Sequence, residues 1–151
     1  MPPTTHKIPI SILVVVHTQT GEVLMLRRQN PSDFWQSITG SLKSGESTIE
    51  AARRELYEET GIEADEQLID CQQENRFPII PPWRDRYAPE VTHNTEHVFT
   101  FQIPEPITIT MNPAEHREYR WLPLREAAAL AGSYTNRDAI LELATEGPQS
   151  D

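Results

Sequence analysis

The segment from Ser47 to Gly61 constrains the fold more than any other part of the chain. Its first residues, Ser47-Thr48-Ile49-Glu50, form a capping-box pattern, which satisfies free N–H groups at a helix start. Gly61 is typical of the position just past a helix end. Between them, apolar or small side chains recur at helical spacing, at Ile49, Ala52, Leu56 and Thr60. The sequence therefore predicts a helix over residues 47–60 with one face on a core.

Strand-forming residues flank this helix on both sides. Residues 8–17 are rich in Ile and Val, and residues 22–27 follow after a short turn, so the pair is typical of a hairpin. Further strands are expected near residues 35–38, 68–75, 97–103 and 118–122, and a proline-rich loop over 77–89. Two more helices are expected, from about Arg125 and from about Asn136 to Leu143. This order predicts an α+β fold, with antiparallel strands and at least one helix packed across them.

Length and charge limit the possible functions. The 151 residues predict one domain over 1–151, with loose termini at 1–6 and 145–151. With 13 Lys and Arg against 23 Asp and Glu, the net charge of −10 argues against a nucleic-acid partner.

The longest apolar run, 12–16, is too short to span a membrane, and the first residues lack the apolar stretch of a secretory signal. The single Cys71 cannot form an internal disulfide and predicts a buried side chain in a reducing, cytoplasmic setting. The oligomeric state stays open.

The predicted helix carries three glutamates that stand together. Glu55 lies three residues before Glu58 and four before Glu59, so their carboxylates share one sector beside the apolar face. A bound cation would relieve the repulsion, and oxygen ligands beside a phosphate favour Mg²⁺, with Mn²⁺ as the alternative. A solvated acidic face is the competing interpretation. Gly40 and Glu46, which precede the helix, favour the cation site over a solvated acidic face.

The whole pattern is G-x5-E-x7-R-E-U-x-E-E-x-G-U, where U is apolar, and residues 40–62 fill each of its fixed positions. By this motif the sequence resembles the Nudix hydrolase superfamily. The resemblance implies an α/β/α sandwich around a mixed sheet and Mg²⁺-dependent hydrolysis of a small-molecule substrate with linked phosphates. It also implies that Glu55 and Glu59 are direct metal ligands and that Glu58 is a further ligand or a catalytic base. Glu46 would support the loop, and Arg54 would orient a glutamate.

Segments outside the motif are similar to a bacterial branch of this superfamily that acts on 7,8-dihydroneopterin triphosphate. They are residues 9–16, 23–28, 33–41, 86–89 and 94–96. The implied products are the monophosphate and pyrophosphate, in folate biosynthesis. Two alternatives remain: hydrolysis of dATP or another nucleoside triphosphate, and a non-catalytic domain that binds nucleotides.

The same similarity implies further site residues. Glu115 corresponds to an additional metal ligand or base. Substrate contacts are expected at Lys7, Arg28, Thr39, His116 and Thr135, and along the ring-binding segment Phe77, Pro78, Ile79 and Ile80. Asn136 is expected to cap the last helix, since Asn is a preferred N-cap residue, although its segment 134–136 could instead close the pocket. The three tryptophans, Trp35, Trp83 and Trp121, are expected to anchor the core or loops.

Overall fold

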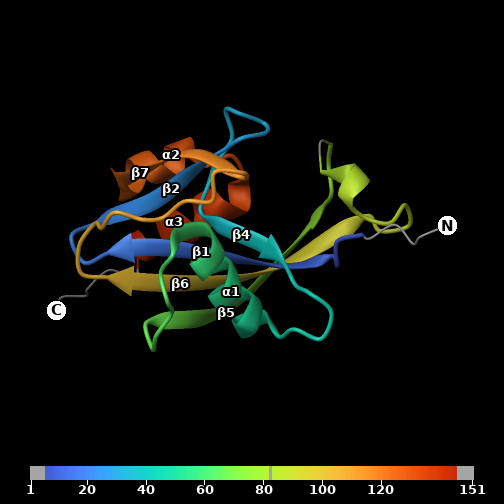
Figure 1. Ribbon diagram of the computed structural model, residues 1–151, viewed down its shortest axis with the longest axis horizontal. Helices are drawn as coiled ribbons and strands as arrows, with labels where there is room; N and C mark the ends of the chain where they lie inside the picture. The colour runs from blue at the N-terminus through green and yellow to red at the C-terminus, as the bar shows by residue number, and fades with distance from the viewer. Residues whose placement is uncertain (1–5, 82, 146–151) are drawn as a thin grey trace.

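The computed structural model describes residues 6–81 and 83–145 of the chain (Figure 1). The elements follow in the order β1 (Ile10–Thr18), β2 (Glu22–Arg28), β3 (Trp35–Gln36), β4 (Ile38–Ser41), α1 (Thr48–Thr60), β5 (Leu68–Pro78), the 3₁₀ turn η1 (Arg84–Arg86), β6 (His93–Ile103), β7 (His116–Pro123), α2 (Leu124–Leu130) and α3 (Tyr134–Thr145). Most of the expected loose residues at the termini lie outside the described part. Thr145 is described, and it ends α3 instead of belonging to a loose tail.

The strands form one mixed sheet around β1. Strand β1 runs parallel to β6 along its whole length, from Ile10 opposite Thr95 to Thr18 opposite Ile103. It pairs in the antiparallel sense with β4 and, at His17 and Val23, with β2. Strand β2 in turn pairs with β3 and β7, and β5 pairs with β6 at an edge. Besides the expected antiparallel pairs, the described strands include the parallel pair of β1 and β6, whose segments lie far apart in sequence.

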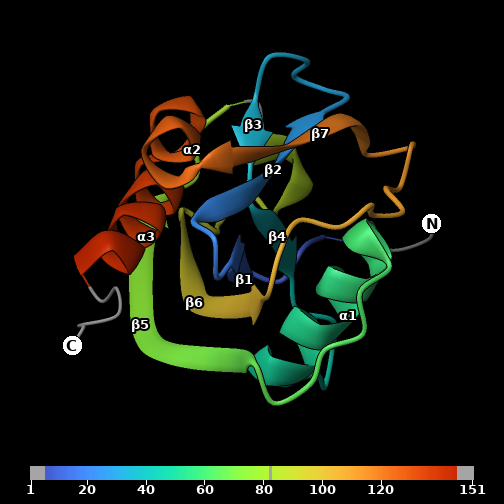
Figure 2. The same ribbon diagram turned by 90° about the vertical axis from the view of Figure 1, so that its left-hand side faces the viewer.

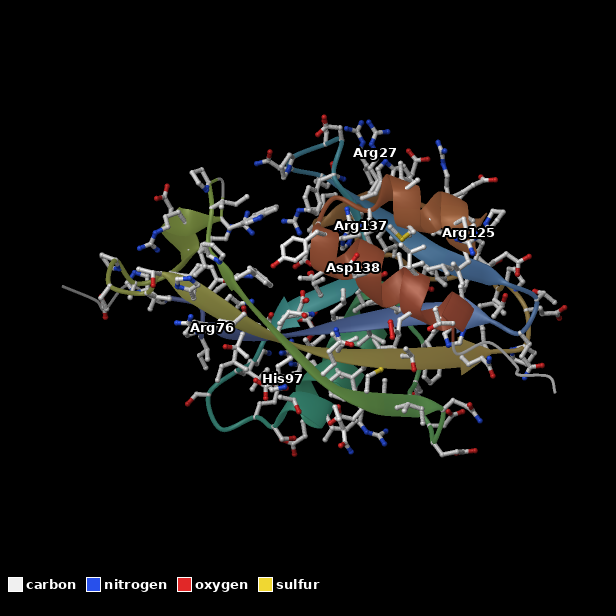
Figure 3. The ribbon with its side chains drawn as sticks, turned by 180° about the vertical axis from the view of Figure 1, so that it is seen from behind. Arg27, Arg76, His97, Arg125, Arg137 and Asp138 are labelled. Carbon is white, nitrogen blue, oxygen red and sulfur yellow. The ribbon has the colours of Figure 1, made fainter. Side chains whose placement is uncertain are left out.

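Helices cover both faces of the sheet. Figure 2 shows α1 on one side and α2 with α3 on the other, and Figure 3 looks onto α2 and α3, with Arg125, Arg137 and Asp138 on their outer surface. Alternate residues of β1 face opposite sides of the sheet. Ile12 and Val14 pack toward α1, whereas Leu13 and Val15 pack toward α2 and α3. The apolar run of β1 is thus explained by burial on both faces, and the expected α/β/α sandwich is confirmed.

Strands β5 and β6 are longer than the sequence indicated. β5 continues to Pro78, and β6 begins at His93, so both extend into segments that composition assigned to a loop or left unassigned. The register of β5 shifts between Asp70 and Glu74, where Gln72 takes a left-handed backbone (φ 55°). Cys71 lies in this irregular segment and is exposed. The prediction of a buried Cys71 was wrong, because the side chains around it on this edge strand are not covered by either helical layer.

The start of α3 also differs from expectation. Ser133 is the capping residue: its hydroxyl accepts from the Asn136 N–H at 3.1 Å, and its carbonyl accepts from the Arg137 N–H at 3.0 Å. Asn136 lies inside the helix, where its side chain makes two buried hydrogen bonds with Ser37 instead. The predicted cap at Asn136 was therefore wrong, since this amide joins α3 to the strand region around Ser37.

Two of the tryptophans anchor the fold as expected. Trp35 is buried in the α2–α3 core, and Trp121 packs against the α1 core while its Nε1 donates to the Ile107 carbonyl at 2.9 Å. In the described part of the chain, the helices are all too short or too polar to cross a membrane.

Candidate active site

A cleft of about 280 Å³ opens where β4 and α1 meet the end of β2, the segment before β1 and the segment before β7. Three acidic and three basic side chains share its lining: Glu55, Glu59, Glu115, Lys7, Arg28 and Arg86. They come from segments distant in sequence, and the start of β1 and η1 lie at the same end of the molecule (Figure 1). The cleft thus gathers a balanced set of charges in a protein whose net charge is −10.

Glu59 is the most buried carboxyl of the cleft. It lies one turn after Glu55 on α1, it is 2% exposed, and its Oε1 has no hydrogen-bond partner among the described residues. Burial raises the pKa of Glu59 well above its ordinary range, and the adjacent Glu55 raises it further. Burial also raises the pKa of Glu55, against the opposing effect of Arg54. Two crowded carboxyls with an unsatisfied oxygen form a site suited to a hard cation.

Gly40 allows Glu55 to occupy this position. A Cβ added to Gly40 would lie 2.6 Å from Cγ of Glu55 and closer still to its carboxyl group. The carboxyl therefore lies directly against the β4 backbone. This contact explains physically why the motif begins with glycine at this position.

Arg54 and Glu46 form a clamp beside the cleft. Nε and Nη2 of Arg54 donate to the two carboxylate oxygens of Glu46 at 2.8 and 2.9 Å, and Nη2 also donates to the Ser41 carbonyl. The hydrogen bonds from Arg54 lower the pKa of Glu46 to about 2. Nη1 of the same guanidinium donates to Glu55 at 3.0 Å. The clamp thus ties the loop before α1 to a cleft carboxylate, which is the arrangement that the motif implied for these two residues.

The four predicted metal ligands are only partly brought together. Glu55, Glu59 and Glu115 line the cleft, whereas Glu58 is half-exposed and accepts from Arg54 at 3.3 Å outside it. Within residues 6–81 and 83–145, no three His, Cys, Asp or Glu side chains are grouped closely enough to hold an ion as they stand.

His116 lies behind Glu59 and does not line the cleft as an expected substrate contact would. Its ring is 1% exposed, with Nε2 3.2 Å from Nε2 of Gln36 and 4.0 Å from Oε1 of Glu59. Burial, with a smaller effect of Arg28, lowers the pKa of His116 to about 4, so the ring is neutral at pH 7. This placement supports a role in positioning Gln36 or Glu59.

Lys7, Arg28 and Thr39 face the cleft as predicted from sequence. The backbone N–H of Lys7 donates to the Arg86 carbonyl at 2.8 Å, which joins the chain start to η1. Burial, followed by the charge of Arg86, lowers the pKa of Lys7. Arg86 itself was not singled out from sequence, although it belongs to the similar segment 86–89.

A second hollow of about 160 Å³ adjoins the cleft and shares Lys7, Arg28 and Thr39 with it. Four aromatic side chains line this hollow, which we call the aromatic slot: Phe34, Phe77, Trp83 and Tyr87. The rings of Phe34 and Trp83 meet edge-to-face at 5.5 Å, and the Arg28 guanidinium lies 4.8 Å from the Trp83 ring centre. Trp83 therefore contributes to the slot and is more than the loop anchor expected from sequence.

The predicted ring-binding segment contributes to the slot only in part. Phe77 lines the slot, whereas Pro78, Ile79 and Ile80 do not. Ile79 is buried and its N–H donates to the Thr92 carbonyl, while Ile80 is 57% exposed. Alternation along β5 turns Pro78 away from the side of Phe77, whereas Ile79 and Ile80 follow the end of the strand and leave the slot with the chain. Thr135 lines the slot as expected, together with Ser133 and Asn136.

Comparisons with known proteins agree with this arrangement. The sequence matches the Nudix domain over residues 7–143. It is 47% identical over 139 residues to the dihydroneopterin triphosphate diphosphatase of Escherichia coli K12, covering 89% of this chain and 91% of the relative. The enzyme of the same name from Haemophilus influenzae is 38% identical, with 86% and 84% covered.

A solved structure shows the same fold. The structure described as the E. coli dihydroneopterin triphosphate pyrophosphohydrolase superposes with a TM-score of 0.88 at 45% identity, covering 95% of this chain and all of that one. The match to the domain and the identity to these relatives both extend over most of the sequence. The chain belongs to the Nudix family.

Proposed function

We propose that the chain hydrolyses 7,8-dihydroneopterin triphosphate to the monophosphate and pyrophosphate in the presence of Mg²⁺. The observation that carries this proposal is the continuity of the charged cleft with the aromatic slot through Lys7, Arg28 and Thr39. A triphosphate joined to a flat heterocycle requires a charged compartment next to an aromatic one. The 47% identity to an enzyme named for this substrate supports the same assignment.

The donor set of the cleft fits a divalent cation. The oxygen Oε1 of Glu59 is buried without a partner among the described residues, and carboxylate oxygens are the protein ligands that Mg²⁺ and Mn²⁺ prefer. We propose Glu55 and Glu59 as direct ligands and Glu115 as a further one, while Glu58, which lies outside the cleft, would act on the ion through water. When bound, Mg²⁺ would neutralise phosphate charge and lower the pKa of an attacking water.

The remaining charged residues bind the triphosphate and move the proton. Lys7, Arg28 and Arg86 donate hydrogen bonds to phosphate oxygens, which offsets the repulsion from an acidic protein. Glu115 takes the proton from the attacking water at its carboxylate; we choose it over Glu58 because it lines the cleft, whereas Glu58 is held by Arg54. Arg54 and Glu46 keep the Glu55 carboxylate in place.

The test compares kcat/KM for 7,8-dihydroneopterin triphosphate and dATP, with pyrophosphate release measured in Mg²⁺ and in EDTA. We expect the pterin substrate to be preferred and activity to be lost in EDTA. A tenfold or greater preference for dATP would transfer the assignment to nucleotide hydrolysis. Absence of pyrophosphate release from either substrate would leave a binding domain only.

The variants Glu55→Gln and Glu59→Gln test the ligand assignment. Both should lower kcat at least about 10²-fold, the scale of losing a principal electrostatic contribution. Glu115→Gln should give a smaller but clear loss. The exposed Glu63→Gln is the matched control for the charge change and should leave kcat unchanged. Near-normal turnover in Glu55→Gln or Glu59→Gln would contradict the assignment.

A further inference from the structure

The far end of the aromatic slot is formed by hydrogen-bond acceptors that the phosphate chemistry does not use. Asn94 and Glu96 lie two residues apart on β6, so they share the strand face that carries Val98 into the α2–α3 core. Both line the slot, and both are almost fully buried, with 4% and 5% of their surface exposed. Polar side chains are rarely buried this deeply unless they are hydrogen-bonded.

Each of the two side chains can accept further hydrogen bonds. The Asn94 amide donates from Nδ2 to Ser11 Oγ at 2.7 Å, but its Oδ1 has no partner among the described residues. The Glu96 carboxyl accepts from Thr135 and, at 3.4 Å, from Nδ2 of Asn75. Both of its described donors are neutral, so the buried carboxylate can accept further N–H groups.

We propose that Glu96 recognises the ring of the substrate by accepting two hydrogen bonds from adjacent N–H groups on a 2-amino-4-oxopyrimidine edge. This inference rests on the proposed function and names the ring chemistry that the same site selects. A pterin presents such an edge, with the 2-amino group beside a ring N–H, and guanine presents the same pair. The unpartnered Oδ1 of Asn94 provides another acceptor at the same end of the slot.

Adenine does not match this acceptor pair. Its 6-amino group can donate one hydrogen bond, but the neighbouring ring nitrogen carries a lone pair that would face the second carboxylate oxygen. A site with a buried charged acceptor rejects a ring that leaves the acceptor unpaired. An amide at the same position offers one donor and one acceptor, which is the pattern that suits adenine. Glu96 is therefore inferred to be the residue that separates the pterin from dATP.

The experiment measures kcat/KM for 7,8-dihydroneopterin triphosphate and dATP in the wild-type protein and in Glu96→Gln. We expect the ratio of the two values to fall by about tenfold or more in the variant, mainly through a higher KM for the pterin. Glu74→Gln is the matched control, because Glu74 is exposed on neighbouring β5 and does not line the slot. An unchanged ratio in Glu96→Gln, or an equal loss for both substrates, would overturn the inference.

A second measurement needs no variant and covers the case in which Glu96→Gln does not fold. Wild-type protein is assayed with dGTP and dITP, which differ only in the 2-amino group. We expect kcat/KM to be about tenfold higher for dGTP, whereas equal values would contradict the proposed recognition. Failure of the proposed function is distinguishable from both results, because it would appear as no Mg²⁺-dependent pyrophosphate release from the pterin by the wild-type protein.

Discussion

At the scale of single residues, Glu59 shows how the site opposes the stability of the fold. Its carboxyl is buried, and its pKa is raised by burial and by Glu55, so the folded state holds the proton more tightly than the unfolded state does. The free energy of unfolding therefore decreases as the pH rises from the ordinary carboxyl pKa through the raised one. Ionisation of Glu59 therefore costs the fold stability, and a bound cation would offset this cost.

The first prediction follows from the cost of ionising Glu59 in the folded state. Without divalent cations at pH 7, Glu59→Gln should raise the melting temperature, because an uncharged amide replaces a carboxyl whose ionisation is costly in this buried position. Added Mg²⁺ should raise the melting temperature of the wild-type protein and have little effect on the variant. Thermal melts in EDTA and in a Mg²⁺ series measure both effects. A lower melting temperature for the variant in EDTA would show that the charge of Glu59 stabilises the fold by itself.

Gly40 provides the second prediction at this scale. In Gly40→Ala the new methyl group would collide with the flexible end of Glu55 and not with backbone, so the side chain moves and the fold remains. We expect a melting temperature close to that of the wild type and a loss of kcat on the order of 10²-fold, from a displaced carboxylate. The same substitution in a Glu55→Gln background should cost little, because the two changes act through one group. Additive losses of kcat in the double variant would show that Gly40→Ala does not act through Glu55.

At the scale of elements, α1 could be predicted with both of its ends. The sequence contains its capping box, its apolar face and Gly61, and the structure shows Ser47 as the N-cap and Gly61 as a left-handed C-cap (φ 80°). These signals are local, because each involves residues within one or two turns. The ends of β5 and β6 could not be predicted in this way. Their pairing, such as Phe77 with Asn94, depends on contacts between segments, and Pro78 is accommodated where β5 ends on the sheet edge.

The start of α3 gives the third prediction. The Asn136 amide accepts from the Ser37 N–H at 2.8 Å and donates to Ser37 Oγ at 2.9 Å, and Asn136 is 1% exposed. Asn136→Ala removes both hydrogen bonds to Ser37 and leaves its buried N–H without this partner, which should lower the free energy of unfolding by about 2–4 kcal/mol. Urea denaturation measures this change. The exposed Glu142→Ala on the same helix serves as the control, and equal effects of the two variants would contradict the anchoring role of Asn136.

At the scale of the whole molecule, the candidate site joins segments that the sequence separates widely. The motif predicted the residues of α1 and its loop, because their spacing is fixed by a helix turn. Trp83, Phe34 and the acceptor end of the slot were not predicted, since their meeting depends on how β6 lies beside β1 and on where α3 begins. The same long-range arrangement places Lys7 and Arg86 together, through one backbone hydrogen bond.

The fourth prediction separates this local arrangement of charge from the net charge of the molecule. The chain contains two lysines, Lys7 in the cleft and Lys43 in the exposed loop before α1, and replacing either by alanine changes the net charge from −10 to −11. If overall repulsion governed substrate binding, both variants would weaken it equally. A charge-assisted hydrogen bond to phosphate acts only at contact distance, so Lys7→Ala should raise KM about tenfold with little change in kcat, and Lys43→Ala should leave KM near the wild-type value. Steady-state kinetics of both variants, measured at one ionic strength, decide between overall repulsion and a local contact with phosphate. A loss confined to kcat in Lys7→Ala would instead assign this lysine to the chemical step.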